Sequence, residues 1–299
     1  MAGMPEDRPD SSRRPFLFAS DLHGCEDRYD KLFALVLSER PAAVFLGGDL
    51  LPSGALRFAR SAPGGEDFLA GFLLPRLNSL RRELGDGYPR FFLILGNDDP
   101  RSQEAALIRR EKEGLWQYLH GRKLSLGPYA VYGYACVPPT PFALKDWERY
   151  DVSRFVDPGC VPPEDGRFSC EVAAEDKGFP TIQQDLEKLA GSDRLENALF
   201  LFHSPPYQTA LDRAALDGRQ VDGAPLDVHV GSIAVRRFIE ARQPLVTMHG
   251  HVHESPRLTG YWRETIGRSH CFSAAHDGPE LAVVSFDPAH PAGAIRKLL

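Results

Sequence analysis

The segment Phe16-Leu-Phe-Ala-Ser-Asp-Leu-His23 begins with an apolar run and continues directly into a carboxylate and an imidazole. Aromatic and aliphatic residues at 16–19, bounded by polar residues, indicate a short buried strand. The same arrangement returns in Ala43-Val-Phe-Leu-Gly-Gly-Asp49. Each stretch therefore predicts a strand with a potential ligand side chain just beyond its end.

Three further apolar runs end in the same way. Phe91–Leu95 leads into Gly96-Asn97-Asp98-Asp99, Ala198–Phe202 into His203, and Pro244–Met248 into Gly250-His251-Val252-His253. Helical patterns separate the strands, at 29–40, 68–83, 103–118, 181–189 and 232–241. This alternation predicts an α/β fold. Because ligands bind at the carboxyl ends of strands in open α/β sheets, we expect these side chains to meet at one edge.

Two carboxylates, four imidazoles and one carboxamide at one edge are more ligands than a single metal ion needs. Such a set suits two ions that share a carboxylate. Two ions about 3.5 to 4 Å apart can share a water and lower its pKa. The alternative is that the five segments carry unrelated polar residues at strand ends.

These segments resemble the pattern of the calcineurin-like metallophosphoesterases, which reads D-x-H, G-D, G-N-[HCD]-[DE], H and G-H-x-H in that order. The resemblance covers about residues 15 to 286. A tighter match lies in His203-Ser-Pro-Pro-Tyr207, Leu211-Asp212, His229-Val-Gly-Ser232 and the residues from His249 to Ser255. These are similar to predicted bacterial and archaeal phosphoesterases related to cyclic-AMP phosphodiesterase.

The resemblance implies a four-layer α/β/β/α sandwich of two mixed sheets between helices. It also implies a ligand set: Asp21, His23 and His253 for the first ion, Asp49 as the bridge, and Asn97, His203 and His251 for the second. A hydroxide between the ions would attack phosphorus in line. Mixed nitrogen and oxygen donors suit manganese, iron, cobalt, nickel or zinc, and we expect manganese first. Gly250 is expected to give the backbone the freedom to aim His251 and His253.

Asp98 stands where many relatives carry a histidine that can protonate the leaving group. An aspartate with a pKa of about 3.9 is ionised at neutral pH and cannot donate a proton. One hypothesis is that the enzyme lacks a strong general acid here and favours activated or metal-assisted leaving groups. The alternative is that Asp98 only supports a ligand or faces solvent, without a catalytic part. Asp99 is expected to orient a ligand by hydrogen bonding.

Groups that bind the phosphoryl oxygens are harder to find. Ser232, in the segment that begins at His229, is predicted to cap a helix over 233–240. The free backbone N–H groups of that helix start would suit an anion. An ordinary capped surface helix remains the alternative. His249 matches no ligand position and is expected to be packed.

Composition bounds the class of protein. The chain has 299 residues, of which 42% are apolar and 25% charged, and a net charge of −6. That charge gives no general attraction for nucleic acid or anionic membranes. Five scattered cysteines fit reduced thiols in the cytoplasm. No apolar run approaches the ~18 residues of a membrane span.

The motifs must meet at one site, which predicts a single domain over 15–299 after a disordered tail at 1–14. The stretch at about 138–180 is rich in proline, charge and aromatic residues and fits neither period. It is expected to be an irregular insertion, either a lid over the substrate or a loop packed on the core.

Together these observations predict a dinuclear metal-dependent phosphodiesterase that acts on a small phosphorylated substrate, possibly a nucleotide. A phosphomonoesterase or a hydrolase of nucleotide pyrophosphates is the alternative among enzymes. A metal-binding interaction scaffold without turnover is the alternative from another class.

Overall fold

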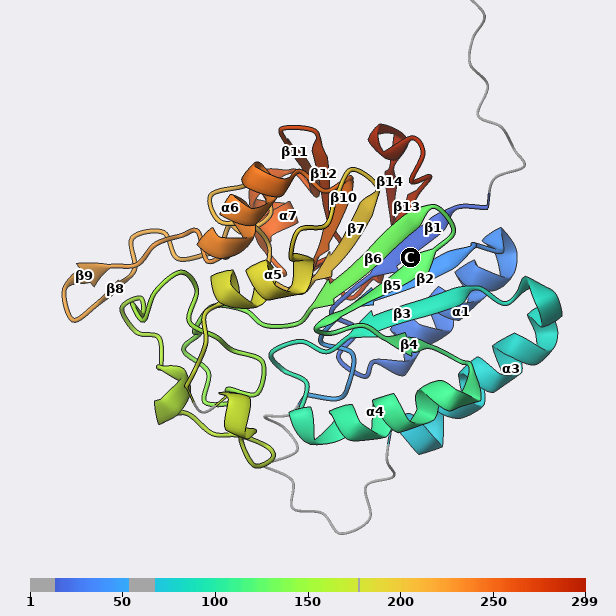
Figure 1. The fold of residues 1–299 in the computed structure, drawn as a ribbon, viewed down its shortest axis with the longest axis horizontal. Coiled ribbons are helices and arrows are strands. Elements are labelled where there is room, and N and C mark those ends of the chain that lie inside the picture. Colours follow the sequence, from blue (N-terminus) through green and yellow to red (C-terminus); the bar gives the residue numbers. More distant parts are fainter. Residues whose placement is uncertain (1–13, 54–67, 177) are drawn as a thin grey trace, which may run out of the picture.

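Two mixed six-stranded sheets form the centre of the computed structural model, which describes residues 14–53, 68–176 and 178–299 (Figure 1). The first sheet has the order β14-β13-β1-β2-β3-β4. Its strands are β1 (Phe16–Ala19), β2 (Ala43–Gly47), β3 (Arg90–Ile94), β4 (Gln117–Tyr118), β13 (Ala282–Phe286) and β14 (Ile295–Leu298). The first and last strands of the described chain thus belong to the same sheet.

The second sheet has the order β11-β12-β10-β7-β6-β5. Its strands are β5 (Arg122–Leu126), β6 (Tyr129–Tyr134), β7 (Ala198–Phe202), β10 (Val246–His249), β11 (Arg263–Ile266) and β12 (Ser269–Ser273). A small hairpin, β8 (Gln220–Val221) with β9 (Ala224–Pro225), lies outside both sheets. Strands β2 and β3 face β6 and β7, so the two sheets pack against each other.

The apolar runs are buried because both faces of each central strand are covered. All residues of β1, β2 and β7 are buried. Strands β1, β2 and β3 run parallel, and so do β6, β7 and β10. Their carboxyl ends therefore lie at the same edge of each sheet, as the sequence predicts.

Helices cover the outer faces of both sheets, which gives the predicted α/β/β/α layers (Figure 1). They are α1 (Glu26–Glu39), α3 (Leu74–Leu84), α4 (Glu104–Arg110), α5 (Ile182–Ala190), α6 (Ile233–Arg242) and α7 (Ser255–Thr259). A wide helical turn, Leu69–Leu73, precedes α3. Helix α6 starts where the sequence predicts, because the Ser232 hydroxyl accepts a hydrogen bond from Val235 N.

The predicted helix over 103–118 is wrong in its second half. Helix α4 ends at Arg110, and a single 3-10 turn follows at Glu111–Glu113. Gly114 then takes a left-handed conformation with φ of 71°, which ends the helix. The chain continues into β4, which pairs with β3. Tyr118 is buried in β4, and Trp116 just before it is buried with its ring N–H donating to the Leu107 carbonyl of α4.

The insertion at 138–180 is irregular, with short turns at Pro163–Asp165 and Ala174–Asp176. Its Trp147 is buried in the main core, where the ring contacts His120, and Lys145 forms an ion pair with Glu148. Both charged side chains are fully buried, and their N–O distance is 2.5 Å. The described part of the insertion is thus a packed structure.

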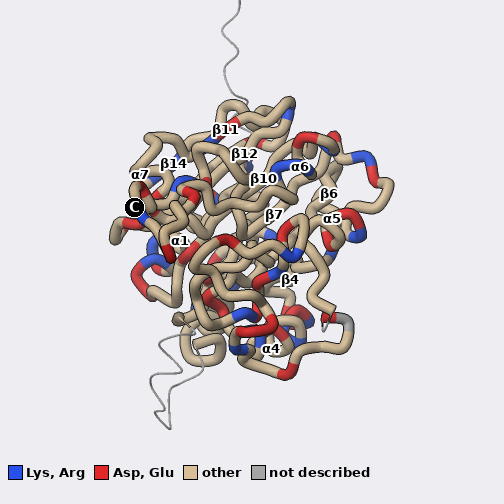
Figure 2. Tube along the Cα trace, turned by 90° about the vertical axis from the view of Figure 1, so that its left-hand side faces the viewer, with Lys and Arg blue, Asp and Glu red and all other residues tan. Residues whose placement is uncertain are grey.

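Two further expectations concern the surface. Of the predicted tail at 1–14, all but Arg14 lies outside the described residues. Figure 2 shows Lys and Arg interspersed with Asp and Glu on the side that it displays. Among the described helices, none is long and apolar enough to cross a membrane.

Candidate metal centre

The seven predicted ligands come from both sheets. The loops after β1, β2 and β3 carry Asp21 and His23, Asp49, and Asn97, respectively. The second sheet supplies His203 directly after β7, and His251 and His253 after β10. The site therefore lies where the carboxyl ends of two parallel strand sets meet.

Four of these residues form a tight cluster. One ligand atom from each of Asp21, His23, Asp49 and His253 lies within 4.8 Å of all the others. His253 Nε2 is 3.3 Å from Asp21 Oδ1 and 3.3 Å from His23 Nε2. His23 Nε2 is 3.9 Å from Asp49 Oδ2. This spacing lets all four side chains contact a common ion.

The remaining three ligands continue from Asp49. His203 Nε2 lies 3.4 Å from Asp49 Oδ2 and 3.0 Å from Asn97 Oδ1. The rings of His203 and His251 are 5.2 Å apart. His203 Nδ1 donates to the Gly47 carbonyl at 2.8 Å, which leaves Nε2 to bind a metal. Asp49 lies between the two groups, where a bridging ligand belongs.

The backbone at the ligands is unusual. Asp21, His23, Asp49 and His251 have φ between 49° and 74°, the left-handed region that non-glycine residues seldom occupy. Such conformations persist when the surrounding structure fixes them, and they gather at functional sites. The left-handed backbone conformation therefore sets the direction in which these side chains leave the loops.

The role predicted for Gly250 is wrong in its mechanism. The left-handed conformation belongs to His251 and not to Gly250. Gly250 is needed because a Cβ at this position would lie 2.7 Å from Asp21 Oδ2 and 2.8 Å from Ser20 Oγ. A Cβ at Gly96 would likewise collide with Asp49 Oδ1 and lie 2.6 Å from His203 Nε2. These glycines allow the two ligand groups to approach each other.

A family model for calcineurin-like phosphoesterases matches residues 14–255, which include every one of these loops. The chain belongs to the calcineurin-like phosphoesterases. No curated protein sequence matches the chain. Members of this family typically bind two divalent metal ions, and Asp21, His23, Asp49 and His253 form a candidate metal-binding cluster.

Solved structures share the fold. One solved structure matches this chain with a TM-score of 0.55 and 17% identity, over 96% of this chain and 98% of the matched chain. The protein TT1561 of Thermus thermophilus matches with a TM-score of 0.51 and 17% identity over 96% of this chain and 99% of its own. A novel archaeal phosphodiesterase has a TM-score of 0.45 and 9% identity, over 95% and 99% of the two chains.

The carboxylates and imidazoles of the phosphoesterase site shift one another's pKa values. Burial alone would raise the pKa of Asp49, but the positive charge of His203, its hydrogen bond and His23 lower it to about 2. Burial alone would lower the pKa of His203, but Asp49 and Asp21 raise it to about 9. Burial and the charge of His203 lower the pKa of His251 to about 3. Metal ions bound here would compete with protons for these imidazole nitrogens.

Asp98 contacts the Nδ1 side of His23, one of the predicted ligands. Its Oδ2 is 3.3 Å from His23 Nδ1, and its Oδ1 accepts a hydrogen bond from Ser53 Oγ at 2.9 Å. The carboxylate thus orients the imidazole so that Nε2 faces the cluster. This contact supports the positioning role that the sequence left open.

Asp99 is fully buried and ties the ligand loops together. Its carboxylate accepts hydrogen bonds from the backbone N–H groups of Leu50, Leu51 and Gly96. The loops after β2 and β3 are therefore fixed relative to each other. Burial, followed by the charge of Asp49, raises the pKa of Asp99 to about 7. Asp99 contacts backbone groups and not a ligand side chain, so its orienting effect is indirect.

The expectation of free N–H groups at the start of α6 is wrong. Asp151 of the insertion accepts hydrogen bonds from Ile233 N at 2.6 Å and from Ala234 N at 3.1 Å, and from the Ser232 hydroxyl. Ser232 itself is fully buried. The helix start therefore already holds an anion from the protein's own chain.

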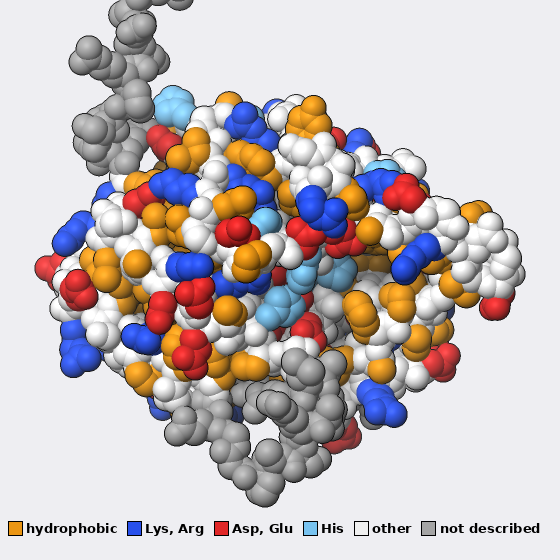
Figure 3. Space-filling view, turned by 180° about the vertical axis from the view of Figure 1, so that it is seen from behind, with side chains coloured by type: hydrophobic (Ala, Val, Ile, Leu, Met, Phe, Trp, Pro, Cys, Tyr) orange, Lys and Arg blue, Asp and Glu red, His pale blue; other side chains and the backbone are white. Residues whose placement is uncertain are grey.

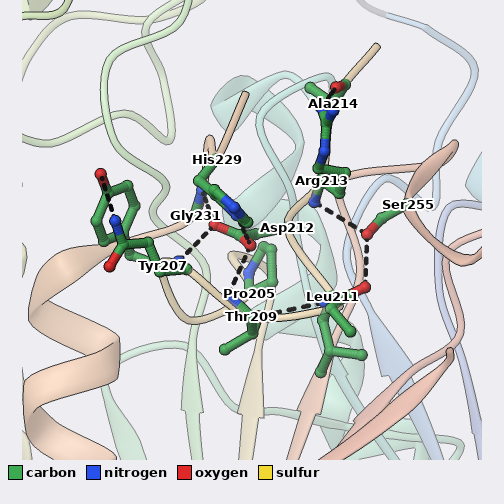
Figure 4. Close-up of polar contacts among 12 residues, drawn as sticks. Pro205, Tyr207, Thr209, Leu211, Asp212, Arg213, Ala214, His229, Gly231 and Ser255 are labelled. Atoms are coloured by element: carbon green, nitrogen blue, oxygen red, sulfur yellow. Dashed lines mark hydrogen bonds and ion pairs between the residues drawn. The ribbon is translucent and has the colours of Figure 1, made fainter. Parts of the chain in front are cut away.

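His229 lies outside the ligand cluster, in the wall of a neighbouring cleft of about 500 Å³. Its Nδ1 is 2.8 Å from Oδ1 of buried Asp212 (Figure 4). His251 lines the same cleft, so the cleft adjoins the proposed metal centre. Figure 3 shows histidine side chains gathered near the middle of this face, with acidic side chains beside them. His249 is packed as expected, with its ring stacked on Phe202.

Several functional contacts could not be found from the sequence. The partners Asp151 and Ser53 lie in irregular segments without a recognisable motif. The pairing of Asp212 with His229 joins two positions that the resemblance had marked separately. Only the folded chain shows that these positions are in contact.

Proposed function

We propose that this phosphoesterase is a dinuclear metal-dependent phosphodiesterase. The observation that carries the proposal is the cluster of Asp21, His23, Asp49 and His253, continued from Asp49 to His203, Asn97 and His251. We assign Asp49 to both ions, the other three members of the cluster to the first ion, and the three residues beyond it to the second. Two ions held there would supply an activated water and positive charge toward the phosphoryl oxygens.

The protein's own residues position this chemistry. His203 is held by the Gly47 carbonyl and His23 by Asp98, so both present Nε2 to the site. Asp99 fixes the loops that carry Asp49 and Asn97. Ordered ligands of this kind keep the geometry of the metal ions constant during the reaction. Manganese is the ion that we expect to support activity in vitro, and the cytoplasm is the compartment that we expect.

Preference for diesters rests on two sequence observations. The tighter resemblance is to phosphoesterases related to cyclic-AMP phosphodiesterase, and Asp98 replaces the histidine of many relatives. A phosphomonoesterase or a nucleotide pyrophosphate hydrolase is the second candidate, because the family model does not separate these activities. A small phosphorylated substrate is expected in each case.

The test compares bis(p-nitrophenyl) phosphate with p-nitrophenyl phosphate in the presence of manganese. We expect turnover of the diester to exceed that of the monoester, and expect Asp49→Ala to abolish both. His290→Gln removes an exposed imidazole far from the ligands in sequence and serves as the control. Turnover of the monoester alone would favour the second candidate. Two bound metal ions with no turnover of either ester would favour the interaction scaffold.

A further inference from the structure

The cleft beside His251 has acidic side chains in its walls. Its walls come from the insertion, from the segment between Tyr207 and Gly231, and from the residues after β10. Its described lining residues include no lysine or arginine, whereas Asp157, Asp227 and Glu254 contribute carboxylates. A phosphorylated or otherwise anionic group would have no cation to bind there.

Exposed aromatic rings line the same cleft. Phe142 is 62% exposed and Phe155 is 70% exposed, and both come from the insertion. Large apolar side chains exposed at a concave surface are typical of ligand pockets. The cleft therefore suits an apolar group without negative charge, next to a site that attracts phosphoryl oxygens.

His229 is held rigidly in the wall of this cleft. Its partner Asp212 is fully buried and accepts hydrogen bonds from backbone N–H groups of Gln208, Thr209 and Gly231 (Figure 4). These donors fix both carboxylate oxygens, and Oδ1 also receives His229 Nδ1 at 2.8 Å. An imidazole anchored in this way has one orientation.

This contact decides which nitrogen of His229 is available. A carboxylate surrounded by N–H donors acts as an acceptor, so Nδ1 of His229 is the donor. Nε2 has no hydrogen-bond partner among the described residues, and the side chain is 29% exposed. When the imidazole carries a proton on each nitrogen, Nδ1 stays bound to Asp212 and the Nε2 proton is the one available for transfer, an arrangement that general acids use.

The reaction needs such a group. When a diester is hydrolysed, a new P–O bond forms from water, and the bond to the leaving oxygen breaks with its electron pair. An alkoxide of an ordinary alcohol leaves slowly unless it receives a proton. Asp98 is engaged with His23 and Ser53 and does not meet this need.

We propose that the cleft receives the leaving alcohol of the substrate and that His229 donates a proton from Nε2 to its oxygen, with Asp212 as the positioning residue. The products are the free alcohol and a phosphomonoester, and His229 regains its proton from solvent. This inference rests on the proposed phosphodiesterase activity. It also names the substrate class: diesters whose leaving alcohol is apolar and carries no phosphate.

The first experiment measures kcat/KM for methyl p-nitrophenyl phosphate and methyl phenyl phosphate with His229→Gln. Nitrophenolate leaves without protonation, so we expect a change of at most about threefold for the first ester. Phenolate is a more basic and poorer leaving group that depends on protonation, so for the second ester we expect kcat/KM to fall by ~10² or more. Asp212→Asn is expected to show a smaller loss with the same dependence. Thermal unfolding and metal content verify that each variant is folded and loaded.

Equal losses on both esters would overturn the proton-donor role, because a merely structural role does not depend on the leaving group. A His229→Gln variant that hydrolyses methyl phenyl phosphate as fast as the wild type would overturn it as well. Failure of the wild type to hydrolyse bis(p-nitrophenyl) phosphate would instead refute the proposed function. The two failures are therefore distinguishable.

The second experiment tests the class of alcohol with a matched pair. Methyl 4-ethylphenyl phosphate and methyl 4-(phosphonomethyl)phenyl phosphate differ mainly in the charge of the leaving phenol. We expect at least a tenfold higher kcat/KM for the uncharged ester, since a tenfold preference needs only about 1.4 kcal/mol. Equal or faster hydrolysis of the phosphonate would overturn the assignment of this cleft to an apolar alcohol.

Discussion

Single residues at this site act through contacts that their type alone does not reveal. The sequence identified Asp21, His23, Asp49 and His253, and the structure brings their ligand atoms together. The resemblance could place them because their order along the chain is the motif itself. It could not assign Asp98, because the decisive contact with His23 depends on the path of a loop.

Asp98→Asn is expected to weaken metal binding. The amide lacks the charge that orients and polarises the His23 imidazole, and such outer carboxylates typically contribute ~10 to 100-fold in metal affinity. Metal competition with a chelating dye measures the loss. Ser53→Ala, which leaves the contact between Asp98 and His23 intact, serves as the matched control with a smaller effect. Unchanged affinity together with slower hydrolysis of poor leaving groups would instead favour a direct catalytic part.

Gly96→Ala is expected to disrupt the bridge between the two ligand groups. The added methyl group would collide with Asp49 Oδ1 and with His203 Nε2, both of which belong to buried side chains. We expect metal content below two ions per chain and at least a tenfold loss of kcat/KM. Gly87→Ala is the control, because the nearest atom to a Cβ there is Arg40 Nη1 at 3.8 Å. Wild-type metal content in Gly96→Ala would contradict this account.

At the scale of elements, the sequence located the five strands that precede the predicted ligands, but it did not predict the other strands of the two sheets and placed the helix ends less well. Strand β1 has the predicted bounds, because four apolar residues between polar ones leave little choice. The second half of the helix predicted over 103–118 is wrong, because Gly114 takes a left-handed conformation after Glu113 and the residues beyond it pair with β3. Local patterns specify burial, and tertiary pairing then decides the conformation.

Asp151→Ala is expected to destabilise α6 and the insertion together. The carboxylate accepts hydrogen bonds from Ile233 N, Ala234 N and the Ser232 hydroxyl, and these donors would be left unsatisfied. We expect the free energy of unfolding to fall by about 1 to 3 kcal/mol in urea denaturation. Asp165→Ala, which replaces an exposed aspartate of the same insertion, is the control. Equal midpoints for the two variants would show that Asp151 does not anchor the helix.

At the scale of the whole molecule, stability is expected to depend on a histidine that is not among the proposed ligands. His120 is half-buried and packs against Trp147 and Tyr134, and its Nδ1 accepts a hydrogen bond from Ala135 N. Burial, followed by the positive charge of Arg101, lowers the pKa of His120 to about 3. The unfolded chain takes up this proton near pH ~6.5, before the folded chain does.

Acid therefore removes the stability that neutral His120 contributes. The contribution is complete above about pH 6.5 and is lost as the pH falls toward 3, with a slope of up to about 1.4 kcal/mol per pH unit. We expect His120→Gln to show a shallower decline of the unfolding free energy between about pH 6 and 4. His290→Gln is expected to retain the wild-type slope. A slope of His120→Gln as steep as that of the wild type would contradict the assignment.

The seven proposed ligands are divided between the two sheets. Metal ions would therefore join parts of the chain that no pairing between the described strands connects. Separation of the sheets destroys the site, so binding free energy adds to the cohesion between the layers. We therefore expect the Tm to rise with manganese concentration and to fall when a chelator is added. Asp49→Ala, which lacks the shared ligand, should show a smaller shift. The catalytic centre would then also act as a fastener between the two halves of the sandwich.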